Sequence, residues 1–337
     1  MIVLSNCLSD KTDEGCLKVA NSLIRRIKRK IPETTIVAYG EARGQGDLYL
    51  SVNKLMLSPK LLWLIWKKKE PLLYVPAVAK AHSMAVRVMV LSLAARRGIR
   101  MISAMQYQTG WLSGLLMKLS GVQIINLSRS SREYYAAIVG DRSRYLRAGV
   151  DTVRFHPVSD GEKAALKSKY GLPQDKPVVL HVGHMKAGRN IKQLMKMDDR
   201  FHAVLVSSTY ASDQQDTQLR EELLRKANFT LIEGYIPRIE EIYQLSDVYL
   251  FPVTASHNCI DIPLSALEAA ACGLPVVTTP YGEMKELLGR EGFYKLESFE
   301  PEKLNQLLAR AYDERKNPRA NVLEYDWDKA VDRLTGF

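Results

Sequence analysis

Short apolar runs alternate with longer amphipathic segments through the first half of the chain. Apolar runs bounded by polar or glycine-containing stretches are typical of buried strands, and apolar positions three and four residues apart are typical of helices. This pattern predicts strands over residues 2–4, 35–39, 72–75, 99–105 and 123–127. It predicts helices between them over residues 15–30, 61–69 and 84–97. Because strands that are separated by helices pair in parallel, the pattern indicates an α/β fold with a doubly wound sheet.

The second half of the chain repeats the alternation. Predicted strands cover residues 177–183, 203–207, 230–233, 248–251 and 274–279. Predicted helices cover residues 162–170, 219–226, 239–245 and 264–272, and a further helix is expected to begin near Ile191. At about 100–200 residues per domain, a chain of 337 residues holds two such domains. We place one over residues 1–155 and the other over residues 156–324, each a Rossmann-like doubly wound unit.

Four loops follow predicted strands of the first half, over residues 9–15, 76–82, 106–111 and 128–132. In doubly wound sheets, ligands bind beyond the carboxyl ends of the strands. A ligand of the first domain is therefore expected to contact these loops.

Positive charge is concentrated in the first half. The chain carries 48 Lys and Arg against 37 Asp and Glu, a net charge of +11. Residues 1–155 hold 25 basic and 10 acidic residues, a net charge of +15, whereas residues 156–337 have a net charge of −4. This asymmetry indicates that the first domain faces an anionic partner. Nucleic acid, an anionic membrane and a phosphorylated acceptor are the candidates.

The composition excludes several classes of protein. With 46% hydrophobic and 25% charged residues, the chain is neither disordered nor fibrous. No apolar run reaches the roughly 20 residues that span a bilayer. The four cysteines lack metal-ligand spacing, and the first residues lack the features of a secretion signal. We therefore expect a cytoplasmic protein that binds no structural metal.

The helix predicted over residues 61–69 has the sequence LLWLIWKKK. It places Trp63 and Trp66 next to Lys67, Lys68 and Lys69. Tryptophans beside lysines are typical of a helix that lies in a membrane interface. A core helix with a solvated basic end has the same composition, and the sequence leaves both interpretations open.

A strand that ends in glycine precedes a basic loop in the second domain. Gly183 closes the strand, and the loop that follows carries Lys186 and Arg189. A glycine lets an anion approach the backbone, and the start of a following helix offers N–H groups. This arrangement suits a diphosphate, although the dinucleotide fingerprint G-x-G-x-x-G is missing. A plain strand–helix turn with two solvated cations is the alternative.

The most specific pattern lies in residues 246–278. The run SDVYLFP, followed ten residues later by PLSALEAAACGLPVVT, resembles the C-terminal domain of the retaining family 4 glycosyltransferases, which have the GT-B fold. The similarity covers about residues 145–335. It implies two Rossmann-like domains that face each other across a cleft. The first would bind the acceptor, with a helix over about residues 325–337 packed back on it, and the second would bind a nucleotide sugar.

The resemblance implies roles for individual residues. Glu268 would accept hydrogen bonds from both ribose hydroxyls, and Arg189 and Lys186 would neutralise the diphosphate leaving group, so that neither a metal nor a cofactor is needed. The donor would be linked to UDP or GDP. The other donor-binding candidates are Gly183, His184, Asn190, Tyr235, Ile236, Pro237 and Ser265.

The chain departs from the family pattern at several positions. The family has a glutamate eight residues before Glu268, where this chain has Ile260, and Asp261 is the nearest substitute for its catalytic role. His184 replaces the arginine that follows the strand glycine, and Arg189 stands in place of a lysine. On the acceptor side the resemblance leaves Gly15, His82, Gln106 and Gln108 as candidates.

The sequence therefore predicts a hexosyltransferase. It would transfer a sugar from a nucleotide diphosphate sugar to a lipid-linked or glycan acceptor, with retention of configuration and without a metal, in polysaccharide or glycolipid biosynthesis. It would act in the cytoplasm or at the inner face of the membrane. A nucleotide-sugar epimerase or a catalytically impaired partner subunit is the first alternative. A module that binds an anionic membrane or nucleic acid is the second, although nucleic acid is not expected because no recognition motif accompanies the charge.

Overall fold

A computed structural model describes residues 1–10, 14–76, 80–185, 187–207, 217–254 and 259–336. The chain divides into two units. The first unit comprises Met1–Ala148, Ile260–Ile262 and Trp327–Phe337, and the second comprises Gly149–Cys259 and Pro263–Asp326. The division after Ala148 falls seven residues before the boundary that the sequence suggested, and the chain returns to the first unit at two later places.

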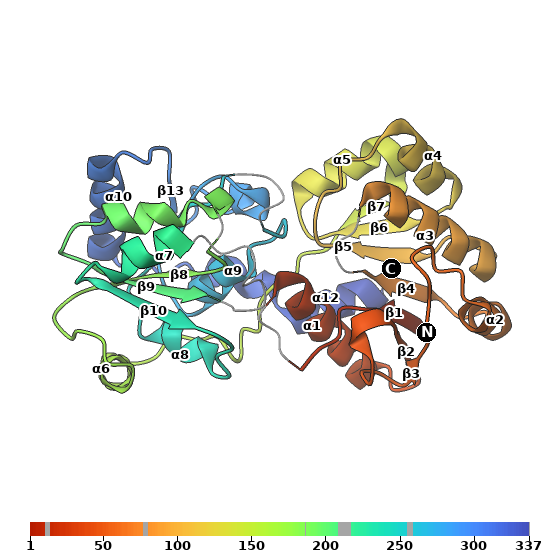
Figure 1. Cartoon of the computed structure of the whole chain (residues 1–337), viewed down its shortest axis with the longest axis horizontal. Helices are drawn as coiled ribbons and strands as arrows, with labels where there is room; N and C mark the ends of the chain where they lie inside the picture. The colour runs from red at the N-terminus through yellow and green to blue at the C-terminus, as the bar shows by residue number, and fades with distance from the viewer. Residues whose placement is uncertain (11–13, 77–79, 186, 208–216, 255–258, 337) are drawn as a thin grey trace. The chain divides into compact units, whose positions relative to one another are not determined.

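The first unit is built on a parallel sheet with the strand order β3-β2-β1-β4-β5-β6-β7 (Figure 1). Its strands are β1 Ile2–Ser5, β2 Thr35–Ala38, β3 Leu48–Tyr49, β4 Leu72–Val75, β5 Arg100–Ser103, β6 Gln123–Asn126 and β7 Ser143–Tyr145. The strand order reverses its direction at β1, next to β4. This reversal is the switch point at which doubly wound sheets bind ligands.

Helices cover both faces of this sheet. They are α1 Gly15–Lys30, α2 Pro59–Lys68, α3 Ala81–Ala95, α4 Trp111–Leu119, α5 Arg129–Val139 and α12 Trp327–Thr335. Right-handed crossovers place α1 on the face opposite to α3, α4 and α5, because the strand order runs in opposite directions from β1. The helices α3 and α4 pack side by side, as do α2 and α3 (Figure 1).

The last helix joins the first unit through both apolar and charged contacts. Trp327, Ala330, Val331 and Leu334 of α12 are buried, which is the spacing of one helix face. The basic last turn of α1 pairs with the acidic side chains of α12: Arg26 and Arg29 contact Asp328, and Lys30 contacts Asp332. These pairs explain part of the basic helix face that the sequence shows.

The second unit has a parallel sheet with the strand order β10-β9-β8-β11-β12-β13. Its strands are β8 Val178–Val182, β9 His202–Ser207, β10 Phe229–Glu233, β11 Val248–Phe251, β12 Val276–Thr278 and β13 Phe293–Lys295. Its α-helices are α6 Asp160–Lys169, α7 Thr217–Leu224, α8 Ile239–Gln244, α9 Leu264–Ala271, α10 Pro301–Glu314 and α11 Arg319–Val322. The switch point of this sheet lies between β8 and β11.

The α/β fold class with two Rossmann-like units is confirmed. Three short strands, β3, β7 and β13, and the helices α5, α10 and α11 were not predicted from the sequence. The predicted loop over residues 128–132 is wrong, because Ser128 caps α5: its hydroxyl accepts a hydrogen bond from the N–H of Ser131. Residues that cap helices, such as serine, are also common in turns, so the start of a capped helix is easily predicted as a loop.

The helix that the sequence placed near Ile191 begins at that residue, as a 3₁₀ helix. The segment forms two 3₁₀ helices, η3 Ala187–Arg189 and η4 Ile191–Lys196, with Asn190 between them in the left-handed conformation at φ +56°. Residues with a short polar side chain tolerate this conformation, and it breaks a continuous α-helix here.

Candidate functional site

The carboxyl end of β8 brings Arg189 onto Gly183. A Cβ atom added to Gly183 would lie 2.2 Å from Nη1 of Arg189, a distance that no real contact shows. The missing side chain therefore provides the space that the guanidinium occupies. The predicted pair of a strand-end glycine and a basic side chain is thus brought together. Lys186 lies outside the described residues.

His181 lies on the same end of β8, one residue before Val182. Its side chain is 1% exposed, and its ring stacks between Tyr249 and Phe251 of β11. Nδ1 is 2.8 Å from the carbonyl oxygen of Leu250. Burial lowers the pKa of His181 to about 4; the hydrogen bond to Leu250 opposes this shift, and the charge of Arg189 adds to it. The ring is therefore neutral near pH 7, with its proton on Nδ1 because a carbonyl can only accept.

The second nitrogen of His181 faces the same space as Arg189. Nε2 lies 3.1 Å from the position that a Cβ of Gly183 would take. It is buried, and no hydrogen-bond partner for it exists among the described residues. A buried acceptor without a partner costs free energy and marks a place where a donor group is expected. The sequence analysis did not single out His181, although a histidine inside an apolar strand is an available signal.

The loop after Gly183 is tied to β11 by Asn190. The amide nitrogen of Asn190 donates to the carbonyl of Pro252 at 3.0 Å and to the hydroxyl of Thr254 at 2.9 Å. Since the amide nitrogen of Asn190 is used in these two hydrogen bonds, its predicted role in donor binding would depend on its Oδ1 atom. His184 is buried next to Gly183, whose N–H donates to the carbonyl of Val206 at 2.9 Å.

Glu268 lies in α9 and is 4% exposed. Its Oε2 accepts a hydrogen bond of 2.8 Å from the hydroxyl of Tyr243, a fully buried residue of α8. A buried carboxylate is stable only where donors reach it, and Tyr243 supplies one of them. The sequence did not identify Tyr243, because α8 and α9 meet only in the folded unit.

Tyr249 connects α9 with the glycine end of β8. Its hydroxyl hydrogen bonds with Ser265, three residues before Glu268, and lies 3.5 Å from the carbonyl oxygen of Val182. Tyr249 therefore contacts both the last residue of β8 and the first turn of α9. The predicted phosphate and ribose residues therefore lie in the same unit, on adjacent secondary-structure elements.

The turn over residues 234–237 joins β10 to α8. Gly234 has φ +102°, which favours glycine, and its N–H donates to the carbonyl of Ser207 at 3.0 Å. Tyr235 is exposed and Ile236 is half-buried. The carbonyl of Pro237 accepts a hydrogen bond of 2.7 Å from Arg154. The turn is therefore held in place at both of its ends.

Two predicted residues from the loop before α9 belong to the first unit. Ile260 lies against Gly15, where an added Cβ would be 3.0 Å from the Ile260 side chain. The N–H of Asp261 donates to the carbonyl of Ala104 at 2.8 Å, and its carboxylate accepts a hydrogen bond from the hydroxyl of Ser131. The isoleucine that replaces a glutamate thus fills the space that Gly15 leaves.

The remaining acceptor-side candidates lie near the carboxyl edge of the first sheet. His82 is exposed in the first turn of α3, with Nδ1 3.5 Å from the hydroxyl of Ser113. Gln106 and Gln108 flank Tyr107, whose N–H donates to the hydroxyl of Tyr135 at 2.9 Å. They follow β5, as expected.

The membrane-facing candidates lie on α2 and its end. Trp63 and Trp66 are 56% and 46% exposed. Lys67 and Lys68 belong to the last turn of α2, and Lys69 follows it in the left-handed conformation. Leu61 and Ile65 on the other face of α2 are buried, so the helix packs on the core through that face while its two tryptophans are exposed.

Among the described residues, no group of three His, Cys, Asp or Glu side chains lies in an arrangement that could hold a metal ion. No helix in the described part of the chain has the length and apolar character to cross a bilayer.

The architecture defines a fold class. Two Rossmann-like units, each built on a doubly wound parallel sheet, are the features of the GT-B fold. Residues 176–314 match the family model described as "Glycosyl transferases group 1". This match falls almost entirely on the second unit and covers less than half of the chain.

Curated relatives that match this chain are named as glycosyltransferases. The chain is 26% identical over 220 residues to a D-inositol 3-phosphate glycosyltransferase of Acidothermus cellulolyticus, covering 58% of this chain and 47% of the relative. It is 24% identical over 209 residues to a GDP-mannose-dependent monoacylated alpha-(1-6)-phosphatidylinositol monomannoside mannosyltransferase of Corynebacterium glutamicum, covering 57% and 55%. The chain thus spans about half the length of the curated relatives it matches.

The fold of the whole chain has a counterpart among solved structures. Anabaena Alr3699/HepE, solved in complex with UDP, superposes with a TM-score of 0.79 over 99% of this chain and 98% of that protein, at 13% identity. At this identity, the similarity shows the GT-B fold.

Proposed function

We propose that this protein transfers a sugar from a nucleotide diphosphate sugar to an acceptor hydroxyl. The observation that carries the proposal is the placement of the Arg189 guanidinium on Gly183 within the unit that also holds the buried Glu268. A charged donor at a strand-end glycine suits a diphosphate, and a carboxylate suits a pair of ribose hydroxyls. The match of this unit to group 1 glycosyltransferases supports the same conclusion.

Each group has a role in the proposed reaction. Glu268 holds the ribose, the turn at Ile236 offers backbone groups to the base, and Arg189 with Lys186 neutralises the diphosphate. Because the diphosphate gains charge as the glycosidic bond breaks, fixed cations stabilise the transition state. These cations take the role that a divalent metal has in other transferases.

The stereochemical part of the proposal is retention. The acceptor hydroxyl attacks the anomeric carbon from the face that the leaving group vacates. The hydroxyl proton passes to an oxygen of the departing diphosphate, so the two products are the glycoside and the protonated nucleoside diphosphate. Asp261, the nearest carboxylate to the position of Ile260, is the side chain proposed to orient the sugar. Its hydrogen bond with Ser131 fixes its orientation.

His181 is proposed to position Arg189. Its Nε2 is an acceptor that faces the space above Gly183, and Nη1 of Arg189 lies in the same space. A hydrogen bond from Arg189 to Nε2 would satisfy the buried nitrogen and hold the guanidinium toward the diphosphate. Hydrogen bonds to charged groups are worth about 1.5–3 kcal/mol.

Two substitutions separate this role from a purely structural one. His181→Asn keeps a donor near the Nδ1 position for the carbonyl of Leu250 and removes the Nε2 acceptor. His181→Gln instead keeps a polar atom near the Nε2 position. We expect His181→Asn to bind the nucleoside diphosphate about tenfold more weakly, a loss of about 1.4 kcal/mol, and His181→Gln to bind more tightly than His181→Asn. Titration calorimetry measures both. The reverse order would show that only the hydrogen bond to Leu250 matters.

The acceptor is proposed to be a lipid-linked sugar or a glycan. A curated relative at 24% identity is named for a phosphatidylinositol mannoside acceptor, and one at 26% identity for inositol 3-phosphate. An anionic acceptor or an anionic membrane suits the net charge of +15 in residues 1–155. We propose that the protein works at the surface of such a membrane, with Trp63 and Trp66 toward the lipid.

Nucleotide binding and turnover test the proposed function. UDP, GDP and ADP are added in a thermal unfolding experiment, and one of them is expected to stabilise the protein by about 2.7 kcal/mol at 100 times its dissociation constant. A labelled UDP- or GDP-sugar is expected to be hydrolysed slowly without an acceptor. Binding without hydrolysis would indicate an impaired partner subunit, and release of an epimerised nucleotide sugar would indicate an epimerase. If none of the three nucleotides stabilises the protein, the proposal is contradicted.

A further inference from the structure

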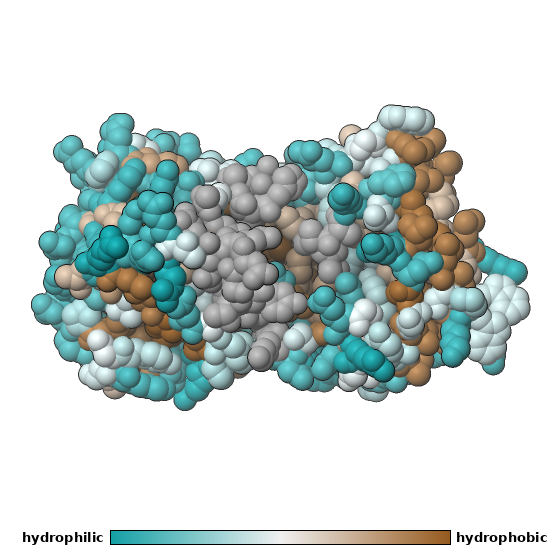
Figure 2. Space-filling model, viewed as in Figure 1, coloured by the Kyte–Doolittle hydropathy of each residue, from teal (hydrophilic) through white to brown (hydrophobic). Residues whose placement is uncertain are grey.

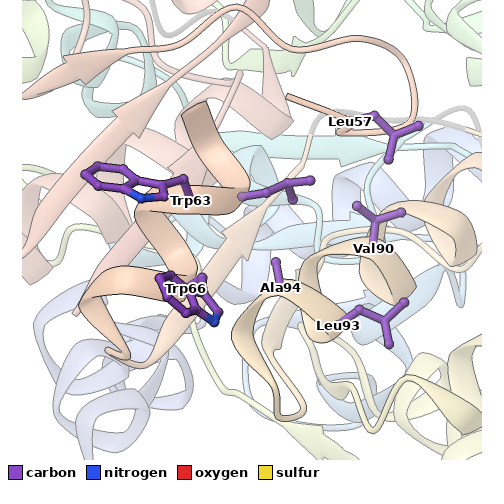
Figure 3. A pocket seen from close by; sticks show the side chains of 7 residues that line it. Leu57, Trp63, Trp66, Val90, Leu93 and Ala94 are labelled. Atoms are coloured by element: carbon purple, nitrogen blue, oxygen red, sulfur yellow. The ribbon is translucent and has the colours of Figure 1, made fainter. Parts of the chain in front are cut away.

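An apolar groove lies between α2 and α3 of the first unit. Its volume is about 460 Å³, within the range of small-molecule sites. Figure 3 shows Trp63 and Trp66 projecting from α2, Val90, Leu93 and Ala94 projecting from α3, and Leu57 on the loop before α2. The lining is completed by Leu62.

The walls of the groove are fixed by hydrogen bonds at both ends. At one end, Arg97 donates to the carbonyl oxygen of Lys69 at 2.8 Å, which ties the end of α3 to the end of α2. At the other end, Arg87 of α3 donates to the carbonyl oxygen of Lys54 at 2.9 Å, which holds the loop that carries Leu57. The opposite face of α2 is anchored by the buried Leu61 and Ile65. The groove is therefore part of the folded unit.

The lining suits a hydrocarbon chain rather than a peptide. All seven side chains are apolar or aromatic, and the indole N–H groups of the two tryptophans are their only polar atoms. A peptide segment brings N–H and C=O groups that need partners, and leaving them unpaired in an apolar groove costs free energy. An alkyl chain brings no such groups.

The surface around the groove is both apolar and cationic. Figure 2 shows apolar side chains over α3 and α4 of the first unit. Large exposed hydrophobic residues among the described part of this region are Leu55, Leu57, Trp63, Trp66, Leu93, Trp111, Leu112, Leu115 and Leu119. Residues 50–119 contain 11 Lys and Arg and one acidic residue, Glu70. A surface of this kind is complementary to an anionic bilayer.

Two of these cations lie on the aromatic walls of the groove. Nζ of Lys67 is 4.5 Å from the ring centroid of Trp63, and the guanidinium carbon of Arg96 is 5.4 Å from that of Trp66. Both cations are exposed. If the alkyl chain of a phospholipid occupied the groove, Lys67 and Arg96 would lie next to its headgroup phosphate.

We propose that the groove between α2 and α3 binds one alkyl chain of an anionic membrane phospholipid, with Lys67 and Arg96 at its headgroup phosphate. The proposal deepens the membrane association suggested above. It differs from docking on a flat surface, because a chain leaves the bilayer interior to fill the groove.

A substitution that fills the groove separates chain binding in the groove from docking on a flat surface. Ala94→Phe fills the groove but also adds apolar surface. Ala137→Phe is the control, because it adds the same side chain at an exposed position of α5 away from the groove. Both substitutions are made in a Trp111→Phe background. The fluorescence then reports contact of Trp63 and Trp66 with lipid, because the remaining tryptophan, Trp327, is buried. Fluorescence is measured on vesicles of phosphatidylcholine and phosphatidylglycerol whose chains are brominated. Binding of monomeric decyl phosphate is measured by calorimetry, with inorganic phosphate as the headgroup control.

The expected result is strong quenching in the background protein and in Ala137→Phe, and at least about a twofold loss of quenching in Ala94→Phe. Decyl phosphate is expected to bind the background protein and to bind Ala94→Phe about tenfold more weakly. Unchanged or increased quenching in Ala94→Phe would overturn the proposal in favour of flat docking, and decyl phosphate binding no better than inorganic phosphate would also overturn it. Nucleotide binding by the same samples reports separately on the proposed function.

Discussion

Replacing Glu268 by glutamine is expected to weaken binding of the preferred nucleoside diphosphate by about 100-fold. Hydrogen bonds to a charged group are worth about 1.5–3 kcal/mol each, and a 100-fold change corresponds to about 2.7 kcal/mol. Glutamine keeps the size of the side chain and can still accept the hydrogen bond from Tyr243, so the buried contact between α8 and α9 is retained. Calorimetric titration of the wild-type and Glu268→Gln proteins measures the difference.

Tyr243→Phe is the matched control for this prediction. It removes the hydroxyl that donates to Oε2 but leaves the carboxylate in α9. We expect a lower free energy of unfolding, because Glu268 is 4% exposed and loses a donor, with a much smaller effect on nucleotide affinity than that of Glu268→Gln. A folded Glu268→Gln protein with wild-type affinity would remove the ribose role of Glu268.

Gly183→Ala is expected to weaken binding of the same nucleoside diphosphate by about tenfold or more. The added methyl group would lie 2.2 Å from Nη1 of Arg189, so the guanidinium has to leave its place above the end of β8. An arginine–phosphate interaction is among the strongest hydrogen bonds in proteins, and its loss removes much of the affinity for the diphosphate. Binding of the nucleoside without phosphates, measured on the same protein, is expected to stay unchanged.

The control for this second prediction is Gly161→Ala. Gly161 lies in α6, and an added Cβ there has no atom within 4 Å. This variant should bind both the nucleoside and its diphosphate as the wild type does. If Gly183→Ala also keeps its affinity for the diphosphate, then Arg189 in its observed position does not hold the phosphates, and the proposed donor site is wrong in this part.

Much of the candidate donor site follows from local sequence. Strand β11 is predicted at its observed bounds, and α9 differs from its prediction by one residue, because an apolar run and a proline-started helix are local features. Glu268 was therefore placed on the correct element. The helix predicted near Ile191 begins at that residue, but it is the 3₁₀ helix η4, and the left-handed Asn190 before it ties the segment to the loop after β11. That contact joins residues more than sixty positions apart.

The amino-acid sequence by itself determined the two α/β units and the basic first half, which depend on periodicity and charge over a few residues. The glycine, arginine and glutamate of the candidate donor site came from a strand-end motif and from the resemblance to a known family. Only the tertiary structure showed that Ile260 fills the space beside Gly15, that Nε2 of His181 faces Gly183, and that α2 and α3 enclose an apolar groove. Each of these is a contact between side chains from different elements, and such contacts exist only once the sheets and helices have packed.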